Sequence, residues 1–166
     1  DDIKTVAIPV VENDTSESGL GLKFTEELRS RFERYGVLKV VDDRSSADAI
    51  LNVRILGVDT RTRSVTGDTD QALEQDILMT ISGELKRRNG QILWKNPLLQ
   101  AAESFADVSD VVVTSSAQFA QSGISSGTLG DLGAREVSRG QKEQALQGLM
   151  EEMGRVLYLD AVAQDF

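Results

Sequence analysis

Two long runs of alternating apolar and polar residues constrain the fold of this chain more than any other feature of its sequence. Apolar residues occupy odd positions in both runs: Ala49, Leu51, Val53 and Ile55 in the first, and Leu73, Ile77, Met79, Ile81 and Leu85 in the second. A period of two is typical of a strand with one buried face. The sequence therefore predicts two long strands that bury their odd-numbered faces.

These strands are expected to pair as an antiparallel hairpin, and parity restricts its turn. Residues directly opposite one another share a face, so paired positions must sum to an even number. A two-residue turn breaks this rule, whereas a three-residue loop at 66–68 satisfies it. We therefore expect Ile55 to pair with Met79, and Val53 with Ile81.

The N-terminal part of the chain has the pattern of a strand, a helix and a second strand. Residues 3–10 and 37–41 predict the two strands. Between them, large apolar residues recur every three or four positions: Leu20, Phe24, Leu28, Phe32 and Tyr35. This spacing predicts an amphipathic helix, which Gly36 is expected to end.

A second hairpin is predicted around the sequence Arg-Asn-Gly-Gln at 88–91. Asn-Gly favours a type I′ turn, which would pair Leu85 with Trp94 and Arg87 with Ile92. A lone tryptophan at such a strand position is more often part of the core than a sugar-binding residue.

The stretch 104–133 contains seven Ser and four Gly, and we expect it to be a long mobile segment with at most a short strand at 111–113. From about Ala134 a helical pattern returns and continues towards the C-terminus. The chain is thus predicted to be one α+β domain, residues 1–166. We expect a two-layer sandwich with two helices packed on one face of a four- to five-stranded mixed sheet, in the order β-α-β-β-β-β-α.

Composition excludes several classes of function. The chain has no Cys and no His, which removes thiol chemistry and a Ser-His-Asp triad. Its net charge of −9 argues against binding to nucleic acid, because phosphate binding needs a basic face. We expect no cofactor and no metal site. Asp42, Asp43 and Asp48 lack the spacing of a calcium loop and are interpreted as turn residues.

Several segments, in order along the chain, resemble the lipopolysaccharide (LPS)-assembly lipoprotein family, LptE. They are 3–10, then Glu12, Asn13 and Thr15, the helical pattern 20–35, and the segments 38–42, 47–51 and 90–94. The resemblance covers residues 3–55 and 77–95 well, and the last helix agrees in placement.

The resemblance implies a non-enzymatic outer-membrane lipoprotein on the periplasmic face. It would be tethered through an N-terminal lipidated Cys, which would lie upstream of Asp1. Such a protein plugs the LptD β-barrel, helps that barrel to assemble and binds LPS during its export to the cell surface.

Two groups of basic residues are candidates for LPS contact. Arg61 and Arg63 are expected near the tip of the long hairpin, where guanidinium groups suit lipid A phosphates. Lys86, Arg87 and Arg88 form the only basic run and flank the Asn-Gly turn. In both places, solvated charges at a hairpin end are the simpler explanation.

Two other interpretations stay open. The chain is also compatible with a different periplasmic α/β binding module, such as a TolB N-terminal-like domain, a CsgG-like component or a lipoprotein that activates a cell-wall synthase. A hydrolase that uses Glu74 and Asp76 is a more remote alternative, because these carboxylates are expected on an exposed sheet face rather than in a pocket.

Overall fold

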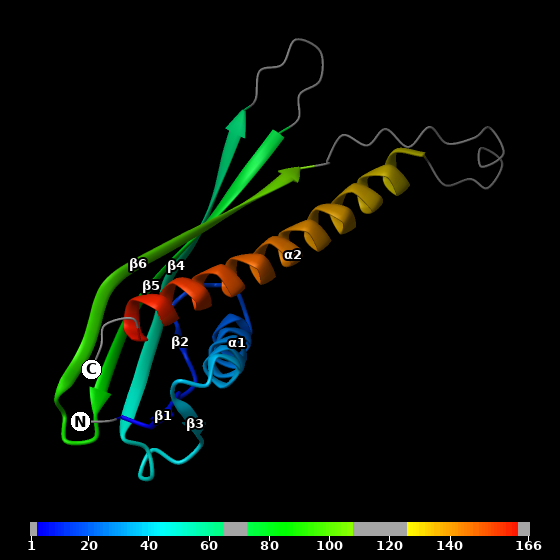
Figure 1. Ribbon diagram of the computed structural model, residues 1–166. Coiled ribbons are helices and arrows are strands. Elements are labelled where there is room, and N and C mark those ends of the chain that lie inside the picture. Colours follow the sequence, from blue (N-terminus) through cyan, green and yellow to red (C-terminus); the bar gives the residue numbers. More distant parts are fainter. Residues whose placement is uncertain (1–2, 65–72, 108–125, 163–166) are drawn as a thin grey trace.

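A long sheet, with two helices on one side, makes up the protein (Figure 1). The computed structural model describes residues 3–64, 73–107 and 126–162. The strands are β1 (Thr5–Ala7), β2 (Glu12–Asn13), β3 (Lys39–Val41), β4 (Ala49–Ser64), β5 (Leu73–Arg87) and β6 (Ile92–Asp107), and the helices are α1 (Leu20–Tyr35) and α2 (Ser126–Val162).

The sheet is mixed, as predicted. Its strands follow the order β3-β1-β4-β5-β6, and the two-residue strand β2 pairs with β4 beside β1. The pairs that involve β1 and β2 are parallel, whereas β4, β5 and β6 are antiparallel. The predicted α+β class is therefore confirmed, with six strands once β2 is counted.

The core lies between the helices and the sheet. Phe24, Leu28 and Phe32 of α1 are fully buried, as are Leu149 and Met153 of α2. The predicted stripe of the first helix is thus confirmed up to Phe32, while Tyr35 is half exposed. Gly36 ends α1 in the left-handed conformation (φ +68°), and its N–H donates to the Phe32 carbonyl at 3.0 Å.

The long hairpin does not have the predicted register. Ile55 pairs with Ile81 and Val53 with Gly83, so these β4 residues meet β5 partners two positions later than expected. The prediction was wrong mainly because it placed the turn at 66–68, whereas the last described pair of β4 and β5 is Ser64 with Leu73. It also assumed an unbroken ladder. The register shifts between Ile55 and Gly57, where one additional residue in β4 makes a β-bulge.

This bulge exchanges the two faces of β4. Before it, odd residues such as Ile55 are buried; beyond it, Val58 pairs with the buried Met79 and packs against the core. Arg61 now pairs with Asp76 on the opposite face of the sheet. The distal part of β4 therefore directs its charged odd-numbered residues away from the helices.

The second hairpin differs from its prediction in its turn. Leu85 pairs with Trp94 as expected, but Ile92 pairs with Lys86 rather than Arg87. A type I′ turn needs positive φ at both central residues, whereas among the described residues only glycines have positive φ, here Gly90 at +91°. The loop closes through the Gly90 N–H, which donates to the Arg87 carbonyl at 2.9 Å.

The ends of the predicted mobile segment 104–133 belong to regular elements. Strand β6 continues to Asp107, and α2 begins at Ser126 rather than near Ala134. The proposed short strand at 111–113 lies outside the described residues. The mobility of the intervening residues stays a prediction.

Trp94 is a core residue, as predicted, and it packs directly on Gly83. A Cβ at Gly83 would lie 2.6 Å from Trp94 Cη2 and 2.7 Å from its Cζ3. The indole Nε1 donates to Asp160 Oδ2 at 3.0 Å, which ties β6 to the end of α2. The absence of a side chain at Gly83 thus gives the indole its place under α2.

We expect Gly83→Ala to destabilise the protein by about 1–3 kcal/mol, because the added methyl overlaps a buried, rigid ring. Urea unfolding monitored by circular dichroism measures this change. Gly140→Ala is the matched control: that glycine is exposed on α2 with nothing within 4 Å of the place a methyl group would take, so the same change should stabilise by up to about 1 kcal/mol. Equal effects at the two positions would contradict the packing argument.

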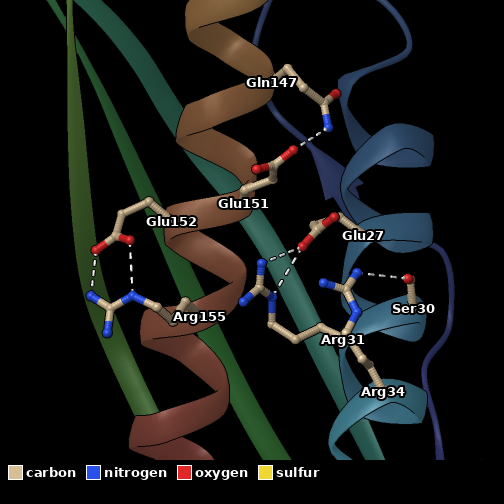
Figure 2. Close-up of polar contacts among 8 residues, drawn as sticks. All are labelled: Glu27, Ser30, Arg31, Arg34, Gln147, Glu151, Glu152 and Arg155. Atoms are coloured by element: carbon tan, nitrogen blue, oxygen red, sulfur yellow. Dashed lines mark hydrogen bonds and ion pairs between the residues drawn. The ribbon is translucent and has the colours of Figure 1, made fainter.

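A buried ion pair on α1 packs against α2 (Figure 2). Arg31 and Glu27 lie one turn apart on α1, and both the Nε and Nη2 of Arg31 donate to Glu27 Oε1, at 3.0 and 2.7 Å. Their side chains are 10% and 13% exposed. Gly154 of α2 leaves room for them, since a Cβ there would come within 3.2 Å of Arg31 Nε.

Glu27→Gln should cost roughly 2–3 kcal/mol of unfolding free energy, because it leaves the Arg31 charge buried without its counter-ion. Glu152→Gln is the control, since Glu152 pairs with Arg155 within a single helix at a half-exposed site and should cost less than about 1 kcal/mol. Urea unfolding of the two variants side by side checks the difference. A Glu27 variant as stable as the Glu152 variant would show that Arg31 does not need its counter-ion at this helix contact.

Candidate functional site

The two predicted basic groups lie at opposite ends of the sheet. Arg61 is exposed in the distal half of β4, and Arg63 stands two residues further on, opposite Glu74 in register. Lys86 and Arg87 end β5, at the other end of the same strand. Glu74 and Arg87 are thirteen positions apart along β5, or roughly 40 Å of extended chain. The two groups therefore cannot contact the same phosphate.

The basic run at the β5–β6 turn is partly occupied by neighbouring groups. Lys86 Nζ lies 2.6 Å from Glu84 Oε1, and this contact, followed by the Coulomb attraction of Lys86 and of Lys95, lowers the pKa of Glu84. Arg88 is exposed in the turn, and its backbone N–H donates to the Asp48 carbonyl at 3.1 Å.

A groove of about 430 Å³ opens between the distal sheet and the first half of α2. Its lining combines cationic, acidic and apolar side chains: Glu17, Gln75, Phe105, Arg139, Lys142, Glu143 and Leu146. Lys142 Nζ lies 2.6 Å from Glu17 Oε1, which joins α2 to the loop before α1. The groove therefore places two cations next to a phenyl ring and a leucine.

The loop that carries Glu17 is fixed by its own hydrogen bonds. Asn13 Oδ1 accepts from the Thr15 N–H at 3.0 Å and from the Thr15 hydroxyl at 2.6 Å. Asn13 Nδ2 donates to the Glu17 carbonyl at 2.8 Å, and the Asn13 backbone is paired with Ile55 of β4. Strand β2 and this Asx turn thus hold Glu17 at the groove.

Sequence reasoning missed Arg139 and Lys142. Both fall in the predicted C-terminal helix, where isolated charges on an exposed helix face give no signal of a site. Lys142 and Glu17 are 125 positions apart, so only the tertiary structure brings them together.

The face of the sheet away from the helices is polar. Arg54 forms an ion pair with Glu12, and Lys95 Nζ lies 3.6 Å from Glu84 Oε2. These residues border a shallow depression of about 270 Å³ in the middle of that face. The arrangement provides paired, solvated charges rather than an enclosed catalytic pocket.

The acidic residues considered as turn residues have local partners. Asp43 Oδ1 accepts from the Ser45 N–H at 2.8 Å, and Asp42 pairs with Arg29. Asp48 Oδ2 accepts from the Thr5 hydroxyl and from the N–H groups of Lys4 and Thr5 at 2.8–3.0 Å, which lowers the Asp48 pKa. Among the described residues, no three potential ligands gather as a metal site would require.

The two carboxylates of the hydrolase alternative lie on the exposed sheet face. Asp76 stands opposite Arg61, and Glu74 opposite Arg63. Asp76 Oδ1 accepts from the Ser104 hydroxyl at 2.7 Å.

Within the described part of the chain, neither α1 nor α2 has the length and apolar character needed to cross a membrane.

Comparison with solved structures finds proteins of the same fold at low identity. A minor lipoprotein from Acinetobacter baumannii is 13% identical and has a TM-score of 0.53, with 98% of this chain and 92% of that chain covered. A hypothetical protein from Chlamydia trachomatis is 13% identical, with a TM-score of 0.51 and coverage of 98% and 100%. A putative lipoprotein from Caulobacter crescentus is 12% identical and has a TM-score of 0.51, with 93% of this chain and 89% of that chain covered.

Comparison with curated proteins finds no match to the sequence. The model of the family described as "LptE: Lipopolysaccharide-assembly" matches residues 3–158. This range contains every described strand and all but the last residues of α2. The resemblance inferred from the ordered segments of the sequence is therefore confirmed, and the chain belongs to the LptE family.

Proposed function

We propose that this protein is an outer-membrane lipoprotein that plugs an LptD-type β-barrel, helps that barrel to assemble and binds LPS on its way to the cell surface. The observation that carries the proposal is the family match over residues 3–158. The protein would face the periplasm and be held by an N-terminal lipid anchor upstream of Asp1. It would act by filling the barrel lumen and by binding LPS, without catalysing a reaction.

The polar face of the sheet supports the role of a plug. The lumen of a large outer-membrane barrel is lined by water and polar side chains, so a domain inside it need not present an apolar surface. The uncovered sheet face meets this condition through cross-strand polar pairs such as Arg54 with Glu12 and Ser104 with Asp76. The buried apolar residues of the sheet pack with those of the helices, while Leu56, Ile92 and Leu98 are exposed.

The groove beside α2 supports contact with LPS. Lipid A presents phosphates next to acyl chains, and the groove places Arg139 and Lys142 next to Phe105 and Leu146. Arg139 is exposed, and the described part of the chain gives it no carboxylate at ion-pair distance. Lys142 is held by Glu17, so a phosphate would compete with that carboxylate.

The two predicted basic groups remain candidates for LPS contact, but we do not expect them to contribute equally. Arg61 and Arg63 belong to the distal end of the sheet, on the face opposite the groove, and are proposed as separate phosphate contacts. Lys86, Arg87 and Arg88 lie at the opposite end, and Lys86 is already paired with Glu84. We therefore expect this second group to contribute less to LPS affinity.

Co-expression with the LptD-type barrel of the same cell tests the plug. The full lipidated protein should co-purify with the barrel, and its depletion should reduce the amount of correctly folded barrel in the outer membrane. A barrel that assembles normally without the protein, or that does not retain it during purification, would contradict the proposal.

LPS binding is tested separately on the soluble chain. Arg139→Glu should weaken LPS affinity about tenfold, because a charge-assisted contact to phosphate is replaced by repulsion. Lys23→Glu on the exposed side of α1 makes the same charge change elsewhere and should leave affinity unchanged within about twofold. Binding measured with immobilised LPS at fixed ionic strength distinguishes the two.

The same assay ranks the predicted basic residues. The R61A/R63A double variant should weaken LPS binding more than the K86A/R87A/R88A triple variant does. If all of these variants bind LPS as the unaltered chain does, LPS contacts another surface and the groove assignment is wrong.

A further inference from the structure

The distal half of β4 has a free edge. On one side it pairs with β5 up to Ser64, whereas on the other side its pairing with β2 ends at Ile55. Within the described residues, no strand continues beside positions 56–64, and this part of β4 projects beyond α1, β1 and β3 (Figure 1). Along positions 56–64, the alternate backbone N–H and C=O groups that do not face β5 are thus open to a further strand.

We propose that this edge pairs with the same edge of a second copy of the chain, as an antiparallel strand pair about a two-fold axis at Thr60. This interaction goes beyond the proposed function and does not depend on it. Thr60 is the midpoint of positions 56–64, so both copies would use their whole free edge. The pairing would end where each copy's own β2 begins to occupy the edge.

Charge complementarity selects the second copy as the occupant. In a pair centred on Thr60, Asp59 of each copy stands opposite Arg61 of the other. Both residues are exposed, and their β5 partners, Leu78 and Asp76, place them on the same face of the sheet. A two-fold axis perpendicular to the sheet keeps that face common to the two copies, so the opposite charges meet twice.

The neighbouring registers are disfavoured by the same residues. Paired positions must share a face, so the register can move only in steps that keep their sum even. The next register in one direction places Asp59 opposite itself, and the next in the other direction places Arg61 opposite itself. Like charges directly opposite are unfavourable. The register with Arg61 opposite itself also places Asp59 opposite Arg63, but of the three registers only the one centred on Thr60 has no like charges opposite.

Sedimentation equilibrium of the chain without LPS or barrel tests the pairing. The chain carries a net charge of −9, which opposes association, so we expect a weak, concentration-dependent dimer. Asp59→Arg should weaken dimerisation about tenfold, because both attractive contacts become repulsive. The swapped variant D59R/R61D should restore dimerisation to within about threefold of the unaltered chain. Circular dichroism confirms that each variant folds.

Single-thiol variants read the register independently, because the chain has no Cys. Directly opposite residues of an antiparallel pair have Cα atoms about 4.5–5.5 Å apart, which suits a disulfide. Thr60→Cys should therefore cross-link two copies under mild oxidation at least about tenfold faster than Thr62→Cys, whose two thiols would be offset along the strands by roughly 13 Å.

Three outcomes would overturn the proposal. A chain that stays monomeric, with T60C oxidising no faster than T62C, has no such pairing. A dimer that is insensitive to Asp59→Arg uses another surface. If the chain alone is monomeric but T60C forms disulfides with single-Cys variants of a co-expressed barrel, the edge pairs with the barrel instead. Because LPS is absent from these measurements, failure of the pairing leaves the LPS-binding proposal unaffected.

Discussion

The bulge between Ile55 and Gly57 determines which way the long hairpin faces. Strand β5 keeps apolar residues at odd positions from Ile77 to Leu85, so its buried face is continuous. Strand β4 does not: its apolar pattern passes from the odd residue Ile55 to the even residue Val58. One additional residue in β4 keeps both apolar sets on the helix side. Without it, Asp59 and Arg61 would turn towards the helix side, where burying an unpaired charge is costly.

The sequence predicted those features that depend on near neighbours. The helical stripe of α1, its end at Gly36 and the pairing of Leu85 with Trp94 all follow from patterns a few residues long. The predicted hairpin register was wrong because the last described pair, Ser64 with Leu73, does not fit a three-residue loop at 66–68, and because one inserted residue shifts the ladder again. The change from Ile55 to Val58 was already visible as a break in alternation. The predicted type of the Asn-Gly turn was wrong because one dipeptide is compatible with more than one loop length.

The start of α2 and the groove show two further limits of the sequence. Three glycines, at 127, 130 and 133, disfavour a helix by intrinsic propensity, yet α2 already includes them. The groove joins residues of the loop before α1, β5, β6 and α2, and its central contact links Glu17 to Lys142. Local charge clustering pointed to Arg61, Arg63 and 86–88 instead, because clustering along the chain is visible in a sequence and proximity in space is not.

The described structure separates the residues that hold the fold from those proposed to meet partners. The core residues Phe24, Phe32 and Met153, together with the buried pair of Arg31 and Glu27, lie where α1 crosses α2. From Leu56 onwards, by contrast, no side chain described in β4 is fully buried. Regions with few buried apolar contacts contribute little to global stability. Burial near the helix crossing stabilises the fold. The distal sheet can therefore have polar faces, an open edge and a groove lined by charged and apolar residues without weakening the core. Its charges remain available to bind other molecules.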